Sequence, residues 1–177
     1  MSGHNKWSQI RRQKEKTDGQ KSKTFSKYGK LIAVEAKKAK GNREAAGLKA
    51  IIERAKTENM PNDNIERAIK KATDNSVVME GITYETYGPG GCAMIIEALT
   101  DNRNKAAQEI KFILSKHGFA LAGIGAAAWA FAKQPTTNNW QPTTTIPISE
   151  ADAETLTKLI EELEDNDEVQ EVFTNAE

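Results

Sequence analysis

The clearest candidate for a binding site is a run of basic side chains at the start of the chain. Residues 1–40 contain 12 Lys and Arg but only three acidic residues. The aromatic residues Trp7, Phe25 and Tyr28 are interleaved with these cations. Because cations bind phosphates and aromatic rings stack on bases, this combination is typical of nucleic-acid binding.

We therefore predict that an amino-terminal arm and the first helix hold the nucleic acid. An ordinary solvated helix face mixes both signs of charge, whereas this run has few acids with which to pair. The alternative is that the basic run docks on the acidic carboxyl-terminal helix of the same chain. The predicted nucleic-acid-binding residues are His4, Lys6, Trp7, Arg11, Arg12, Lys14, Lys16, Lys21, Lys23, Lys27 and Lys30.

Other residues that could carry chemistry are too scattered to form a site. His4, Cys92 and His117 do not lie at helical or hairpin ligand spacings, and structural zinc needs clustered ligands, so we predict no metal site. The polar residues 101–104 lie at a predicted strand-to-helix junction but include no paired nucleophile and base. We predict that the protein has no catalytic residues and is not an enzyme.

Two glycine-rich segments resemble phosphate-binding loops in composition alone. Residues 123–128 (GIGAAA) match the glycine pattern of a dinucleotide fingerprint, but no parallel β-α-β series surrounds them. Residues 88–91 (GPGG) lack the Lys-Ser/Thr of a phosphate loop and are typical of a hairpin turn. We therefore predict no cofactor and no small-molecule substrate.

Three amphipathic helices are expected to position the basic residues. The i, i+3, i+4 recurrence of apolar residues predicts a first helix that begins at Thr24 and ends at Gly41, as a C-terminal cap. Two more helices are predicted over about 43–59 and 61–72. Residues 1–75 are thus predicted to be a basic, helical nucleic-acid-binding domain.

Beyond residue 75 the apolar period changes to two, which indicates strands. A hairpin strand and then the order β-α-β-β-α-β predict an α+β, ferredoxin-like domain over 76–177. Its predicted elements are strands at 82–87 and 92–99, a helix between Asn102 and Gly118, strands at 126–132 and 144–148, a helix from Ser149, and a last strand at 168–173.

The charge of the chain is distributed very unevenly although its formal net charge is zero. Residues 1–71 hold 19 basic and 8 acidic side chains, and residues 72–177 hold 6 and 17. Such asymmetry of charge indicates that residues 1–71 bind a polyanionic partner. No apolar run approaches a membrane span, no secretory signal is present, and Cys92 has no partner, so we expect a cytoplasmic protein without membrane contacts.

Several strings of the sequence closely resemble the YebC/PmpR family. They are residues 3–10 (GHNKWSQI), 59–63 (NMPND), 65–71 (IERAIKK), 87–91 (YGPGG), 99–104 (LTDNRN) and 115–118 (SKHG). The resemblance implies a cytoplasmic regulator of gene expression, a probable transcriptional regulatory protein that binds DNA. Because some members of the family activate translation or assist the ribosome, it also implies an alternative, a translation factor that binds ribosomal RNA.

The chain departs from that family in one respect. Members usually carry an additional domain inserted between Phe131 and the closing β-α-β, where this chain has only the predicted loop 132–143. We therefore expect the basic helical domain to carry more of the binding in this protein than in its longer relatives.

Overall fold

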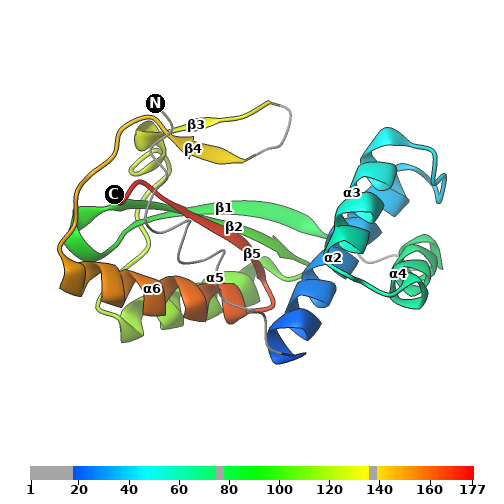
Figure 1. Cartoon of the computed structure of the whole chain (residues 1–177), viewed down its shortest axis with the longest axis horizontal. Helices are drawn as coiled ribbons and strands as arrows, with labels where there is room; N and C mark the ends of the chain where they lie inside the picture. Colours follow the sequence, from blue (N-terminus) through cyan, green and yellow to red (C-terminus); the bar gives the residue numbers. More distant parts are fainter. Residues whose placement is uncertain (1–17, 75–77, 136–138) are drawn as a thin grey trace. The chain divides into compact units, whose positions relative to one another are not determined.

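In the computed structural model, the described residues are 18–74, 78–135 and 139–177. They form two compact units, which are described separately (Figure 1). The first, called the helical unit, falls within Lys16–Glu80, and the second, called the sheet unit, contains Gly81–Glu177. The mixed α+β class that the sequence predicts is confirmed.

The helical unit is made of three helices, as predicted, although the first is already helical at Asp18 instead of beginning at Thr24. They are α2 (Asp18–Lys38), α3 (Ala46–Thr57) and α4 (Asn62–Asp74). All three contribute to one apolar core, in which Ile32, Leu48 and Ile65 are fully or almost fully buried. Burial of this shared core, more than helix propensity, holds such short helices together.

The carboxyl-terminal ends of α2 and α4 lie side by side. Gly41 follows α2 with a φ of +79°, and its N–H donates to the Ala36 carbonyl at 2.9 Å, which confirms the predicted helix cap. A Cβ built on Gly41 would lie 3.4 Å from Cγ2 of Thr73, in the last turn of α4. The helix ends are therefore in van der Waals contact.

The sheet unit is built on a three-stranded sheet of order β1-β2-β5. Its strands are β1 (Glu80–Tyr87), β2 (Ala93–Thr100) and β5 (Val169–Thr174), and β2 pairs with β5 in antiparallel register. The predicted turn at 88–91 is confirmed, since the short helix η1 (Pro89–Gly91) joins β1 to β2.

Two helices, α5 (Arg103–Lys116) and α6 (Glu150–Asp165), cover one face of this sheet (Figure 1). Ile96 of β2 is fully buried against them, together with Ile110 and Leu159. The predicted N-caps are both confirmed: Asn102 accepts the Lys105 N–H at 3.1 Å, and Ser149 accepts the Asp152 N–H at 3.1 Å.

The other face of the sheet is covered by a separate hairpin. Its strands, β3 (Phe131–Lys133) and β4 (Trp140–Pro142), pair with each other, and Phe131 packs with Ala93 and Ile95 of β2. The order β-α-β-β-α-β is therefore present, but the two middle strands form a sheet of their own instead of extending the main sheet.

Two predicted strands differ from the structure. The strand predicted over 126–132 begins only at Phe131, because Ala128–Ala130 form the short helix η2. The strand predicted over 144–148 is reduced to one bridge between Ile146 and Ala176, and β4 lies instead within the predicted loop 132–143. The backbone near both predicted strands is held by residues distant in sequence, Glu85 for the first and Asn175 for the second, which local periodicity does not reveal.

Among the described residues, no helix has the length and apolarity that crossing a lipid bilayer would require.

Candidate nucleic-acid interface

Four of the predicted binding residues lie on α2. By helical geometry, Lys23, Lys27 and Lys30 share one face of this helix, whereas Lys21 lies on another. That face continues to Lys37, in the last turn of α2, and lies away from the core residue Ile32. The remaining predicted residues lie outside the described residues; they are His4, Lys6, Trp7, Arg11, Arg12, Lys14 and Lys16.

The aromatic residues of α2 do not serve the stacking role that the sequence suggested. Phe25 and Tyr28 pack against the core of the helical unit beside residues such as Ile32. In the described parts of the chain, the exposed large apolar side chains all lie at Val78 or beyond. The described helical unit therefore offers a nucleic acid its cations, without an exposed aromatic ring.

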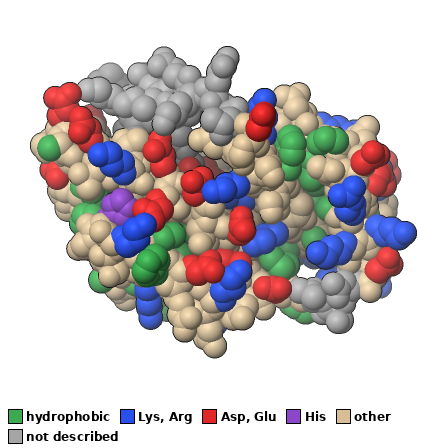
Figure 2. All heavy atoms as spheres, turned by 90° about the horizontal axis from the view of Figure 1, so that it is seen from below, with side chains coloured by type: hydrophobic (Ala, Val, Ile, Leu, Met, Phe, Trp, Pro, Cys, Tyr) green, Lys and Arg blue, Asp and Glu red, His purple; other side chains and the backbone are tan. Residues whose placement is uncertain are grey.

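The positive charge of the helical unit remains after its ion pairs are counted. Residues 18–74 contain 14 Lys and Arg against 8 Asp and Glu. Three of these acids are paired within the unit: Glu35 with Lys38 at 2.8 Å, Glu44 with Lys49 at 3.7 Å, and Glu66 with Arg43. Figure 2 shows Lys and Arg side chains exposed over the helical unit, at the right of that view. The net excess of basic over acidic side chains gives this unit a positive surface.

The sheet unit has the opposite charge. Residues 81–177 contain 6 basic and 15 acidic side chains, many of them on α6. Two of its cations are engaged by carboxylates: Lys105 contacts Glu168 at 3.0 Å, and Lys116 contacts Glu162 at 2.5 Å. The hydrogen bond from Glu168 is the largest of the interactions that raise the pKa of Lys105. A polyanion would thus be repelled by most of this unit.

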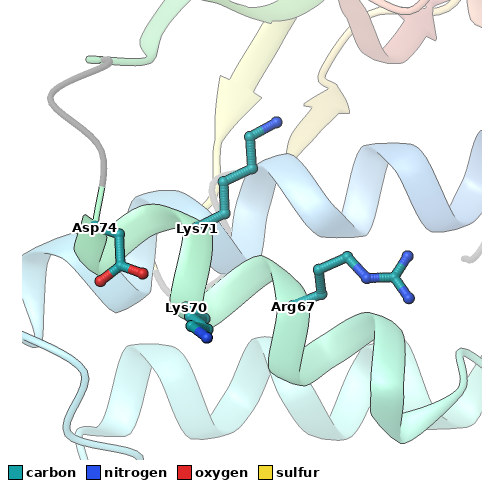
Figure 3. Close-up of a pocket in the computed structure, with 4 residues that line it drawn as sticks. All are labelled: Arg67, Lys70, Lys71 and Asp74. Carbon is teal, nitrogen blue, oxygen red and sulfur yellow. The ribbon is translucent and has the colours of Figure 1, made fainter.

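The sequence analysis missed a group of cations on α4. Arg67, Lys70 and Lys71 are exposed and, together with Asp74, line a shallow hollow (Figure 3). Their i, i+3, i+4 spacing places them on neighbouring positions of one helix surface. Figure 3 shows the three basic side chains extending outward from the helix, and no carboxylate of the described residues forms an ion pair with them.

A second hollow lies where the carboxyl-terminal ends of α2 and α4 meet. It is lined by Lys37, Lys40, Ala72 and Thr73, which come from the ends of α2 and α4. We call the cations of the two hollows the terminal patch. Its members are Lys37, Lys40, Arg67, Lys70 and Lys71. The signals in the sequence were the basic string at 37–40 and the adjacent lysines at 70–71.

The glycine-rich segment at 123–128 is occupied by a side chain of the protein itself. The carboxylate of Glu85 on β1 accepts the backbone N–H groups of Gly125, Ala127 and Ala128 at 2.7, 2.7 and 2.8 Å. Burial raises the pKa of Glu85, but these three donors lower it, and the net pKa lies below its ordinary value. The N–H groups that a bound phosphate would need are therefore already satisfied.

Two of the three residues weighed as metal ligands, Cys92 and His117, have structural surroundings, and His4 lies outside the described residues. Cys92 is fully buried in the core of the sheet unit, and this burial raises the pKa of its thiol. His117 ends α5, with its Nε2 2.8 Å from Oε2 of Glu162. Within the described ranges, no three His, Cys, Asp or Glu side chains cluster in a way that could hold a metal ion.

Comparison with known families gives matches over almost the whole chain. The family model described as the TACO1/YebC protein N-terminal domain matches residues 5–75. The model described as the TACO1/YebC second and third domain matches residues 79–138 and 134–176. The two stretches of this second match meet, with an overlap, at 134–138, between β3 and β4.

Individual relatives agree with the family models. A probable transcriptional regulatory protein of Thermosipho africanus is 35% identical over all of this chain and 94% of its own length. The alignment spans 237 positions for a chain of 177 residues, so about 60 positions face gaps in this chain. A protein of the same description from Pseudothermotoga lettingae is 46% identical over 76% of this chain and 54% of its own length.

A solved structure has the same fold. It is the crystal structure of the conserved hypothetical protein Aq1575 from Aquifex aeolicus, which superimposes with a TM-score of 0.83 at 30% identity. The match covers 97% of this chain and 96% of the other.

Proposed function

This chain belongs to the TACO1/YebC family, and we propose that it is a nucleic-acid-binding regulator of gene expression that has no enzymatic activity of its own. In this proposal the helical unit and the basic residues that precede it hold DNA. The observation that carries the proposal is the excess of 14 basic over 8 acidic side chains in residues 18–74, on a unit with its own apolar core.

Two further observations support the choice of DNA as the partner. The relatives compared above are described as probable transcriptional regulatory proteins, and such a protein acts on DNA. The acidic residues 81–177 would be repelled by a phosphate backbone, so contacts would fall on the helical unit and the basic residues that precede it. Lys23, Lys27 and Lys30 share one face of α2 and would contact phosphates there.

Binding of this kind would be strongly dependent on salt. Each phosphate contact by a Lys or Arg releases condensed counterions, so the affinity falls as the salt concentration rises. Contacts with phosphates fix the register and orientation of a protein on a duplex, whereas sequence is read from the base edges. In the described helical unit, the exposed cations would supply the contacts with phosphates.

A second candidate function is that of a translation factor bound to ribosomal RNA. The absence of an exposed aromatic ring in residues 18–74 favours contacts with phosphates alone, and these suit ribosomal RNA as well as DNA. A sequence-specific DNA reader should prefer its site to random DNA by about 4 kcal/mol or more, whereas a ribosome-bound factor shows only the salt-dependent background.

One experiment separates the two candidates. The tagged full chain is sedimented through a lysate gradient at two salt concentrations, and the nucleic acid crosslinked to it is sequenced. We expect protein that sediments apart from ribosomes and crosslinks enriched on a DNA motif. Comigration with ribosomes and crosslinks to ribosomal RNA would replace the DNA proposal with the translation-factor candidate.

A further inference from the structure

The terminal patch combines the end of α2 with cations of α4. At 1.5 Å per residue, Lys37 lies about 24 Å along α2 from Lys21 but only about 10 Å from Lys30, so it continues the cationic face of that helix. This shorter distance is close to the Debye length at physiological ionic strength, about 8 Å. The members of the terminal patch on α4 lie outside the predicted residues and need an explanation of their own.

The negative ends of the helix dipoles offset only part of the positive charge of the terminal patch. Each helix end carries about half a negative unit charge, so the adjacent ends of α2 and α4 together offset about one cation. Asp74, which lines the same hollow as Arg67, Lys70 and Lys71, offsets one more. Four cations of the terminal patch, Lys40, Arg67, Lys70 and Lys71, form no ion pair among the described residues, so about two of these four charges remain uncompensated.

The nearest acids of the helical unit are engaged elsewhere. Glu66, next to Arg67 in sequence, pairs with Arg43, and Glu35 pairs with Lys38 at 2.8 Å. Lys40, Lys70 and Lys71 are exposed and form no ion pair among the described residues. Closely placed like charges of this kind repel one another unless a counter-charge from outside neutralises them.

From this arrangement we propose that the terminal patch is a second anchoring site, which binds the phosphate backbone of a nucleic-acid duplex. The inference rests on the proposed function and adds a site outside the predicted residues 4–30. The two hollows are shallow and their cations spread outward, which suits an extended polyanion more than a small phosphate compound (Figure 3).

The choice of a duplex over a single strand follows from the aromatic residues of α2, which are partly buried against the core. Proteins that bind single strands stack unpaired bases on exposed aromatic rings, which contribute about 1–3 kcal/mol per base. In residues 18–74 the aromatic side chains Phe25 and Tyr28 pack on the core instead. Cations without a stacking surface contact the backbone of a helix whose bases remain paired.

The test uses two full-length triple variants that lose the same charge. The patch variant is Arg67→Ala, Lys70→Ala and Lys71→Ala on α4, and the matched control is Lys49→Ala, Arg54→Ala and Lys56→Ala on α3. Each set removes one Arg and two Lys from exposed positions of the same unit. Circular dichroism and thermal unfolding establish that both variants are folded.

Affinity is measured by fluorescence anisotropy over a series of salt concentrations. The probes are a random-sequence DNA duplex, an RNA duplex and a DNA single strand of equal length. For the patch variant we expect at least a tenfold loss of duplex affinity and a salt slope flatter by about two to three units. The control variant should lose clearly less duplex affinity. The patch variant should lose less affinity for the single strand than for the duplexes.

The outcomes are distinguishable. If the patch variant binds duplexes as the control does, the terminal patch is not an anchoring site, and the proposed function survives on the other residues. If the single strand loses as much affinity as the duplexes, the assignment to a duplex is wrong. If the wild-type chain binds none of the probes, the proposed function itself fails.

A charge-preserving variant, Arg67→Lys with Lys70→Arg and Lys71→Arg, should retain duplex binding.

Discussion

The carboxylate of Glu85 accepts the backbone N–H of Ala127 at 2.7 Å, across 42 residues of sequence. With Gly125 and Ala128 as further donors, this side chain fixes the loop that leads into β3. Glu85 is only 7% exposed, so its charge is stabilised by these donors more than by water. The sheet unit therefore depends on a single buried carboxylate to shape its second face.

Replacing Glu85 by Ala should destabilise the sheet unit. The substitution leaves the N–H groups of Gly125, Ala127 and Ala128 without their acceptor, at a cost of about 3 kcal/mol or more. The free energy of unfolding is measured by urea titration followed by tryptophan fluorescence. Glu154→Ala, at an exposed position of α6, is the control and should change stability by about 0.5 kcal/mol or less. Equal stability of the two variants would contradict the structural role of Glu85.

The same carboxylate should make stability depend on pH. Its folded-state pKa lies below the ordinary value of 4.5, so Glu85 contributes stability above that value. The contribution is lost as the pH falls from about 4.5 through the lower folded-state pKa. The wild-type chain should thus lose more unfolding free energy than Glu85→Gln between about pH 6 and about pH 3. Parallel pH profiles for the two proteins would show that Glu85 has an ordinary pKa.

These contacts explain why part of the fold was not predictable from the sequence. The apolar pattern identified the three helices and the strands β1 and β5 by their repeating apolar positions, and β2 by its continuous apolar run, since β2 is buried at almost every position. It gave a strand over 126–132 because Trp129 and Phe131 alternate with alanines. The backbone there is instead turned by Glu85, and no local pattern reveals an acceptor some forty positions away.

The two units should unfold separately because each has its own core. Leu48 is fully buried in the helical unit, and Leu48→Ala should cost that unit about 3 kcal/mol. Trp129 and Trp140 lie in the sheet unit, whereas residues 18–74 contain no tryptophan. The part of the helical signal in circular dichroism that comes from α2, α3 and α4 should therefore be lost at lower urea than the fluorescence signal. A single coincident transition in this variant would contradict separate unfolding.

Neutralising the predicted amino-terminal cations should weaken binding. Replacing Lys14, Lys21 and Lys23 with Ala removes three phosphate contacts, so the plot of log affinity against log salt should flatten by about two to three units. The matched control replaces Lys111, Lys133 and Lys158 of the acidic sheet unit and should leave the slope almost unchanged. If both variants bind like the wild-type chain, the assignment of these amino-terminal lysines as phosphate contacts is wrong.

The sequence predicted the basic charge of the candidate interface but not where its cations lie in the structure. Counting charges identified the basic half of the chain, since net charge needs no structure. It did not reveal that Gly41 meets Thr73, so that Lys40 lines a hollow together with Ala72 and Thr73 at the end of α4. Nor did the spacing show that Phe25 and Tyr28 face the core, because aromatic residues on an amphipathic helix suit either role.

The most direct test of the central claim is the affinity of the full chain for a random-sequence DNA duplex over a series of salt concentrations. The positive helical unit predicts binding at low salt and a linear fall of log affinity with log salt, with a slope of about −4 or steeper. A chain that fails to bind at the lowest salt, or whose affinity does not change with salt, would contradict the assignment of this protein as a nucleic-acid-binding regulator.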